Sequence, residues 1–148
     1  MGMRHLGRQL ALKALYRIDI CGGASDGDLA LFFDSFPADA DTRAFTSSLV
    51  AGVTREEKVL DSHIADTLEN WTIRRLSRVD HNILRLALYE LLFVADVPAR
   101  VTFDEAIELA KRYGDQNSGR FVNGVLDHLA GRLGVKEKGD ETRAEKTG

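Results

Sequence analysis

Apolar residues recur every three or four positions along most of this chain, the spacing that places them on one face of an α-helix. The clearest example is a stripe in the segment 118–133 that consists of Val122, Val125, Leu126, Leu129 and Leu133. With about 100° of rotation per residue, Phe121 lies roughly 100° from the centre of this stripe. We therefore expect its ring beside the core rather than in it. The residues expected around the ring are Asn117, Arg120, Gly124 and His128.

Glycines, prolines and capping residues divide the preceding sequence into further predicted helices. The first covers residues 4–20 and ends at the glycine pair 22–23. A short second helix starts after Ser25 or Asp26 and ends before Pro37. Strand patterns are nearly absent, so the sequence predicts an all-α bundle of about seven helices.

A third helix is expected to start after Asp39 or Asp41. It either continues through Leu68 or kinks near Gly52, and residues 71–77 are expected to form a loop.

The segment 79–94 is apolar on nearly all sides, which is typical of a helix surrounded by other helices. Glu90 is the exception, because it lies in the same arc as Ile83 and Leu86. A carboxylate there is buried or lies at an interface, and a buried one must be hydrogen-bonded or paired. We expect Glu90 to anchor neighbouring helices.

Thr102 and Glu105 have the Thr-x-x-Glu spacing of a capping box, which predicts that a helix starts there. This helix runs to Tyr113 and is followed by Gly114. Asn117 or Ser118 is expected to cap the last helix.

The charge distribution sets the end of the chain apart from the rest. Residues 135–148 carry eight charges without apolar periodicity, so we expect a helical domain over 1–134 and a disordered tail over 135–148.

Composition indicates one globular domain, with 148 residues of which 44% are hydrophobic. The single cysteine, Cys21, excludes an internal disulfide and a cysteine-cluster metal site. Neither a membrane-spanning segment nor a signal-peptide core is visible, so we expect a cytoplasmic protein. The four histidines lack metal-ligand spacing and no phosphate-binding loop is present. We therefore expect no metal, no cofactor and no enzymatic activity.

Net charge is −3, which excludes a uniformly polybasic nucleic-acid binder. However, residues 1–18 carry four basic and no acidic side chains, whereas residues 19–41 carry six aspartates and no basic side chain. Arg4, His5 and Arg8 share an arc of roughly 100°, where the cations could neutralise phosphates. The alternative is a helix with an ordinary solvated basic side.

Phe121 is a second candidate for nucleic-acid contact, since an aromatic ring beside the core can stack on an unpaired base. Arg100, Lys111 and Arg120 are additional cations in this half of the chain. The alternative for Phe121 is packing at the edge of the core.

Several motifs occur in order between residues 4 and 130. They are Arg8-x-x-Ala11-x-x-Ala14-Leu15-Tyr16, Val79-Asp80-x-x-Ile83-Leu84-Arg85-Leu86-Ala87-Leu88-Tyr89-Glu90-Leu91, Asp96-Val97-Pro98, Glu105-Ala106-Ile107-Glu108-Leu109-Ala110-Lys111 and Ser118-x-x-Phe121-Val122-Asn123-Gly124-Val125-Leu126-Asp127. Together they resemble the NusB family of bacterial transcription antitermination factors.

This resemblance implies two packed three-helix units and a non-enzymatic RNA-binding protein. Its implied partners are boxA RNA, chiefly of ribosomal RNA leaders, NusE, which is also a small-subunit ribosomal protein, and the RNA polymerase antitermination complex. The positions implied to touch RNA are Arg4, His5, Arg8, Asn117, Ser118, Arg120 and Phe121. Those implied to face NusE are Tyr16, Asp80 and Arg85.

The sequence departs from the family pattern at two places. Leu6 and Gly7 interrupt the N-terminal basic run, which is denser in relatives, and Gln116-Asn117 is neutral where relatives commonly have acids. Because a carboxylate repels a nearby phosphate, we hypothesise that Asn117 partly compensates for the thinner basic run. Asn123 and Gly124 are expected to allow close helix contact.

Two other functions fit a helical module of this kind. One is an RNA-targeting domain of an RNA cytosine methyltransferase, although no catalytic domain follows in this sequence. The other is a protein-interaction module without nucleic acid, which the net acidity favours. Salt-dependent binding of boxA RNA would separate the last alternative from an antitermination factor.

Overall fold

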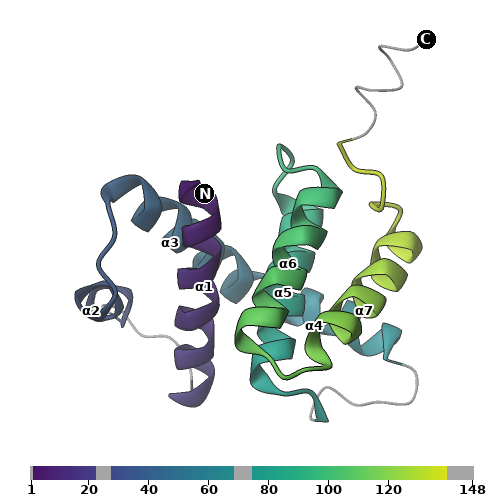
Figure 1. The fold of residues 1–148 in the computed structure, drawn as a ribbon, viewed down its shortest axis with the longest axis horizontal. Helices are drawn as coiled ribbons and strands as arrows, with labels where there is room; N and C mark the ends of the chain where they lie inside the picture. The colour runs from purple at the N-terminus through teal and green to yellow at the C-terminus, as the bar shows by residue number, and fades with distance from the viewer. Residues whose placement is uncertain (1, 23–27, 69–74, 140–148) are drawn as a thin grey trace. The chain divides into compact units, whose positions relative to one another are not determined.

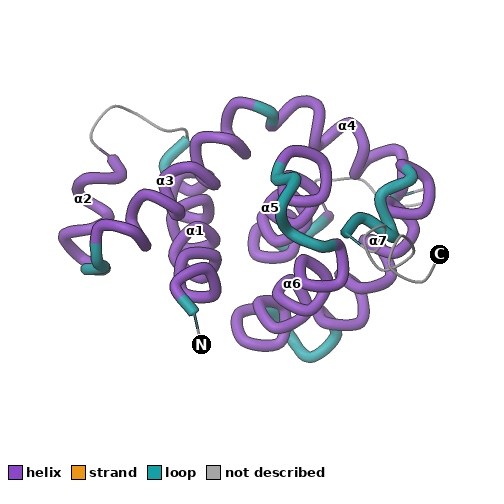
Figure 2. The backbone as a smooth tube through the Cα atoms, turned by 90° about the horizontal axis from the view of Figure 1, so that it is seen from above, coloured by secondary structure: helices purple, strands orange, loops and turns teal. Residues whose placement is uncertain are grey.

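The computed structural model describes residues 2–22, 28–68 and 75–139. These residues form seven helices and no strand (Figures 1 and 2). The chain divides into two compact units, residues 1–55 and 56–148. The first holds three described helices, as expected, and the second holds four rather than three. Ser25, Asp26 and residues 71–74, for which the sequence predicts a cap and a loop, lie outside the described residues.

The first unit consists of α1 (Met3–Ile20), α2 (Asp28–Ser35) and α3 (Ala40–Arg55), with α1 packed along α3. The Asp39 carboxylate accepts a hydrogen bond of 2.8 Å from the Thr42 backbone N–H, which identifies Asp39 as the cap of α3. This bond holds the pKa of Asp39 below its usual range. The third helix does not continue to Leu68: α3 runs past Gly52 and ends at Arg55, and α4 begins at Glu57.

The second unit is built around α5 (Arg78–Phe93), which contacts α4 (Glu57–Thr67), α6 (Ala99–Tyr113) and α7 (Ser118–Leu133) (Figure 2). Every residue of α5 from Asp80 to Leu91 is buried, as its apolar pattern predicts. The Ser77 hydroxyl caps the helix by accepting a hydrogen bond of 3.0 Å from the Asp80 N–H.

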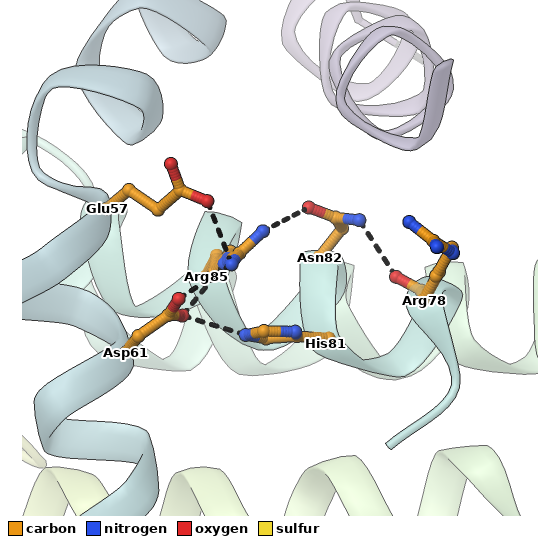
Figure 3. Close-up of polar contacts among 6 residues, drawn as sticks. All are labelled: Glu57, Asp61, Arg78, His81, Asn82 and Arg85. Carbon is orange, nitrogen blue, oxygen red and sulfur yellow. Dashed lines mark hydrogen bonds and ion pairs between the residues drawn. The ribbon is translucent and has the colours of Figure 1, made fainter. Parts of the chain in front are cut away.

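A partly buried ion cluster joins α4 to α5 (Figure 3). Arg85 on α5 donates from Nε and Nη2 to the two carboxylate oxygens of Asp61 on α4, at 2.8 and 2.6 Å, and lies 2.9 Å from Glu57. His81 Nε2 lies 2.7 Å from Asp61 Oδ1. Burial by itself raises the pKa of Asp61. The hydrogen bonds from Arg85 and His81 more than offset this effect, and the pKa of Asp61 falls to about 2.

The capping box predicted at Thr102 and Glu105 is wrong. Helix α6 begins at Ala99, three residues earlier, so Thr102 lies inside the helix. Its hydroxyl donates instead to Glu90 Oε1 on α5, at 3.4 Å. Glu90 is 2% exposed and hydrogen-bonded, which confirms the prediction of a buried carboxylate that anchors neighbouring helices.

Lys138 connects the segment after α7 to two other helices. Its Nζ donates to the backbone oxygens of Glu90 and Val94 at the end of α5, at 2.7 and 2.5 Å. Its own carbonyl accepts a hydrogen bond of 2.8 Å from the N–H of Ala99, the first residue of α6. Residues 135–139 are therefore attached to the second unit, and the remainder of the predicted tail, 140–148, lies outside the described residues.

Replacing Lys138 with methionine should lower the free energy of unfolding by about 1–2 kcal/mol, because charge-assisted hydrogen bonds to two helix-terminal carbonyls are lost. The expected loss is nearer to about 1 than to about 2 kcal/mol, because burial partly desolvates the cation and so offsets part of the gain from its hydrogen bonds. The same burial lowers the pKa of Lys138. Urea unfolding measures the change. The matched control is Lys136→Met, which removes only an exposed ion pair with Asp127 and should cost less than about 0.5 kcal/mol. Equal losses in the two variants would contradict this role of Lys138.

Asp61 should make stability depend on pH below its ordinary pKa of 3.8. Its pKa is lower in the folded chain than in the unfolded chain, so its stabilisation is present above about pH 5 and is lost as pH falls toward 2. Urea unfolding at several pH values should show Asp61→Asn destabilised by about 1–2 kcal/mol near neutral pH, with the difference from the wild type shrinking in acid. Asp66→Asn, on the exposed side of the same helix, is the control and should differ little at any pH. A difference for Asp61→Asn that does not change with pH would refute the assignment.

Candidate nucleic-acid interface

The N-terminal basic side chains lie on α1 in the first unit, but they differ in exposure. Arg4 is exposed, His5 is half-buried with its Nε2 3.2 Å from Gln9 Nε2, and Arg8 is only 3% exposed. The guanidinium carbons of Arg4 and Arg8 lie 5.3 and 5.7 Å from the ring centroid of Phe45 on α3. Of the two arginines, Arg4 presents the more accessible side chain, and the expected phosphate contact of Arg8 stays a prediction.

The turn before α7 uses the side chain of Ser118. Its hydroxyl accepts a hydrogen bond of 3.0 Å from the Asp115 N–H, and it is 1% exposed. A β-carbon at Gly114 would collide with this hydroxyl, so the turn requires a glycine there. The Ser118 side chain is therefore part of the turn, and its expected contact with RNA stays a prediction.

Asn117 is the N-cap residue of α7, and its side chain makes no capping hydrogen bond. It is exposed, and its N–H donates to Asp115 Oδ1 at 2.7 Å. Its carbonyl accepts a hydrogen bond of 3.0 Å from the N–H of Phe121, one turn into the helix.

Phe121 lies beside the core stripe, as the sequence predicts. It is half-buried, whereas Val122, Leu126 and Leu129 on the same helix are fully buried. Arg120 next to it is exposed.

The prediction that Gly124 allows close helix contact is wrong. Gly124 is exposed, and a β-carbon there would have no neighbour within 4 Å. The close approach occurs at Gly119, where a β-carbon would lie 3.3 Å from Lys111 Cγ on α6. The exposed Lys111 therefore lies over the first turn of α7.

Arg100 lies apart from these residues. It is in the first turn of α6, eleven residues before Lys111, which is about 16 Å along the helix axis. There it lines a groove with Phe103, Ile107, Asn123 and Lys136. The structure thus gathers Lys111, Asn117, Arg120 and Phe121 at one end of the α6–α7 pair and leaves Arg100 at the other.

The residues expected to face NusE are in different environments. Tyr16 on α1 is 39% exposed. Arg85 is 7% exposed and engaged with Asp61 and Glu57, and its expected contact with NusE stays a prediction. Asp80 is 9% exposed, and its Oδ1 is buried without a hydrogen-bond partner in the part of the chain that the structure describes.

Sequence reasoning missed Phe45 and Asp61. Nothing local in the sequence links Phe45 to Arg4 and Arg8, which are thirty-seven or more positions earlier. Asp61 gave no signal, because its partners are twenty and twenty-four positions away. No group of residues suited to hold a metal occurs among the described residues, and no described helix is long and apolar enough to cross a membrane.

Comparison with known proteins gives a consistent result. The NusB family model matches residues 5–131. The transcription antitermination protein NusB of Geobacter sulfurreducens is 46% identical over 134 residues, which cover 90% of this chain and 97% of that protein.

Two solved structures extend the likeness to the fold. A structure of T. maritima NusB has a TM-score of 0.81 and 39% identity, covering 93% of this chain and 94% of that one. A crystal structure of antitermination factors NusB and NusE in complex with dsRNA has a TM-score of 0.78 and 30% identity, covering 87% and 96%. From its family-model match, its close relatives and its all-helical fold, the chain belongs to the NusB family.

Proposed function

We propose that this chain is a transcription antitermination factor that binds boxA RNA together with NusE and supports processive transcription of ribosomal RNA operons. It acts as a non-catalytic RNA-binding adaptor of the RNA polymerase antitermination complex. The names of its relatives support the first part, and the solved complex of NusB, NusE and RNA supports the partners. Because bacterial transcription takes place in the cytoplasm, the proposal implies a cytoplasmic protein.

The observation that carries the RNA-binding proposal is the group of side chains at the start of α7. Phe121 is half-buried, and Arg120, the residue before it, is exposed. The side chain of Asn117, one helical turn earlier, makes no capping hydrogen bond, and Lys111 lies over the same turn. An aromatic face stacks on an unpaired base, and the two cations attract the phosphates on either side of it. We name Arg4 on α1 as the N-terminal phosphate contact, since it is exposed and Arg8 is not.

Asp80 and Tyr16 are the residues that we assign to NusE. A buried carboxylate oxygen without a donor costs about 1–3 kcal/mol, and a partner that supplies an N–H or O–H group removes that cost. Tyr16 offers a half-exposed ring with a polar tip, a residue type enriched at protein interfaces.

Replacing Phe121 with alanine should weaken boxA RNA binding by about 1–3 kcal/mol, the usual loss for one base stack, while the helix content stays unchanged. Fluorescence anisotropy with labelled RNA measures the affinity, and circular dichroism measures the helix content. Phe93→Ala is the matched control, because Phe93 is a 44% exposed ring at the end of α5. A large loss of helicity in Phe121→Ala, or an equal loss of affinity in Phe93→Ala, would refute the stacking role.

Replacing Asn117 with aspartate should weaken binding about three- to tenfold at low salt, because a carboxylate about 4 Å from a phosphate costs of the order of 1 kcal/mol. The difference should shrink as salt screens the repulsion. The same anisotropy titration, repeated at several salt concentrations, measures both effects. Unchanged affinity at low salt would show that Asn117 does not compensate for the thinner basic run.

A further inference from the structure

One aromatic ring contacts both N-terminal arginines of the first unit. Arg4 and Arg8 are one helical turn apart on α1, and their guanidinium carbons lie 5.3 and 5.7 Å from the centroid of the Phe45 ring. Both distances are within the range of a cation–π interaction. Phe45 itself belongs to α3 and is half-buried.

The backbone of α1 is shaped to receive this ring. Gly7 lies between the two arginines, and a β-carbon there would collide with the Phe45 ring. The next residue on α3, Thr46, donates its hydroxyl to the Thr42 carbonyl at 2.8 Å, and the same hydroxyl lies 3.3 Å from the Gly7 carbonyl, so the two helices are in close contact at this point. The glycine that interrupts the basic run is therefore the residue that allows the ring to lie against α1.

We propose that Phe45 is a positioning residue of the RNA interface, a ring that holds the Arg4 guanidinium in place before RNA arrives. This inference rests on the proposed RNA-binding function. A ring face attracts a guanidinium without cancelling its charge, so the held cation still attracts phosphate. A side chain that is already ordered loses less conformational freedom on binding than one that moves freely in solvent. The buried Arg8 packs against the same ring and helps to fix it, and the exposed Arg4 meets the RNA.

The same unit contains a matched control. Lys13 Nζ lies 5.0 Å from the centroid of the Phe36 ring, so a second cation–π pair occurs in the same unit. Lys13 is not among the residues assigned to RNA. Phe36→Leu therefore removes an aromatic ring from the same unit without touching Arg4.

The test measures binding of a boxA-containing RNA by fluorescence anisotropy over a range of salt concentrations. Phe45→Leu should weaken binding about two- to tenfold, the cost of ordering one more mobile side chain, with an unchanged salt dependence because Arg4 still reaches a phosphate. Arg4→Gln should instead reduce the slope of log affinity against log salt by about 0.7. Phe45→Tyr, which keeps the ring, should bind like the wild type, and so should Phe36→Leu.

A double-mutant cycle completes the test. If Phe45 acts through the arginine, Phe45→Leu should cost less in an Arg4→Gln background than in the wild type. Equal costs in both backgrounds, wild-type affinity for Phe45→Leu, or an equal loss in Phe36→Leu would each overturn the inference while leaving the proposed function intact. Absence of salt-dependent RNA binding by the wild type would overturn the proposed function itself and this inference with it.

Discussion

The second unit depends on the burial of α5, because a polar side chain that is buried with that helix needs a hydrogen-bond or ion-pair partner. Arg85 takes Asp61 and Glu57 from α4, and Glu90 takes the hydroxyl of Thr102 from α6. Breaking one such contact leaves a buried polar or charged group unsatisfied, which costs more than the contact itself contributes. These contacts therefore attach α4 and α6 to the central helix at defined positions.

The candidate interface follows from that scaffold. Once α6 is fixed on α5, the close approach at Gly119 brings the first turn of α7 under Lys111, and the turn at Ser118 sets where that helix starts. Phe121 is then held half-buried, with enough contact to fix the ring and enough exposure to stack. In the first unit, Phe45 and Gly7 give the arginines of α1 a comparable fixed support.

The sequence could predict those features of the fold and the candidate site that depend on the spacing of apolar residues within one helix. The apolar surroundings of α5, the displacement of Phe121 from its stripe and the burial of Glu90 all follow from helical periodicity, and the structure confirms them. The capping box predicted at Thr102 is wrong because α6 begins three residues earlier and the Thr102 hydroxyl donates a hydrogen bond to the buried carboxylate of Glu90, twelve positions away. The inward position of Arg85 was equally invisible, since its partner Asp61 lies on another helix.

The central claim is that a chain of net charge −3 binds one particular RNA through a few well-placed side chains and does so together with NusE. Titration of labelled boxA RNA and of a scrambled RNA of equal composition, with and without NusE, tests this claim most directly. The account predicts salt-dependent binding that is tighter for boxA RNA than for the scrambled RNA and is strengthened by NusE. Equal binding of the two RNAs, or no salt-dependent binding even with NusE present, would contradict it.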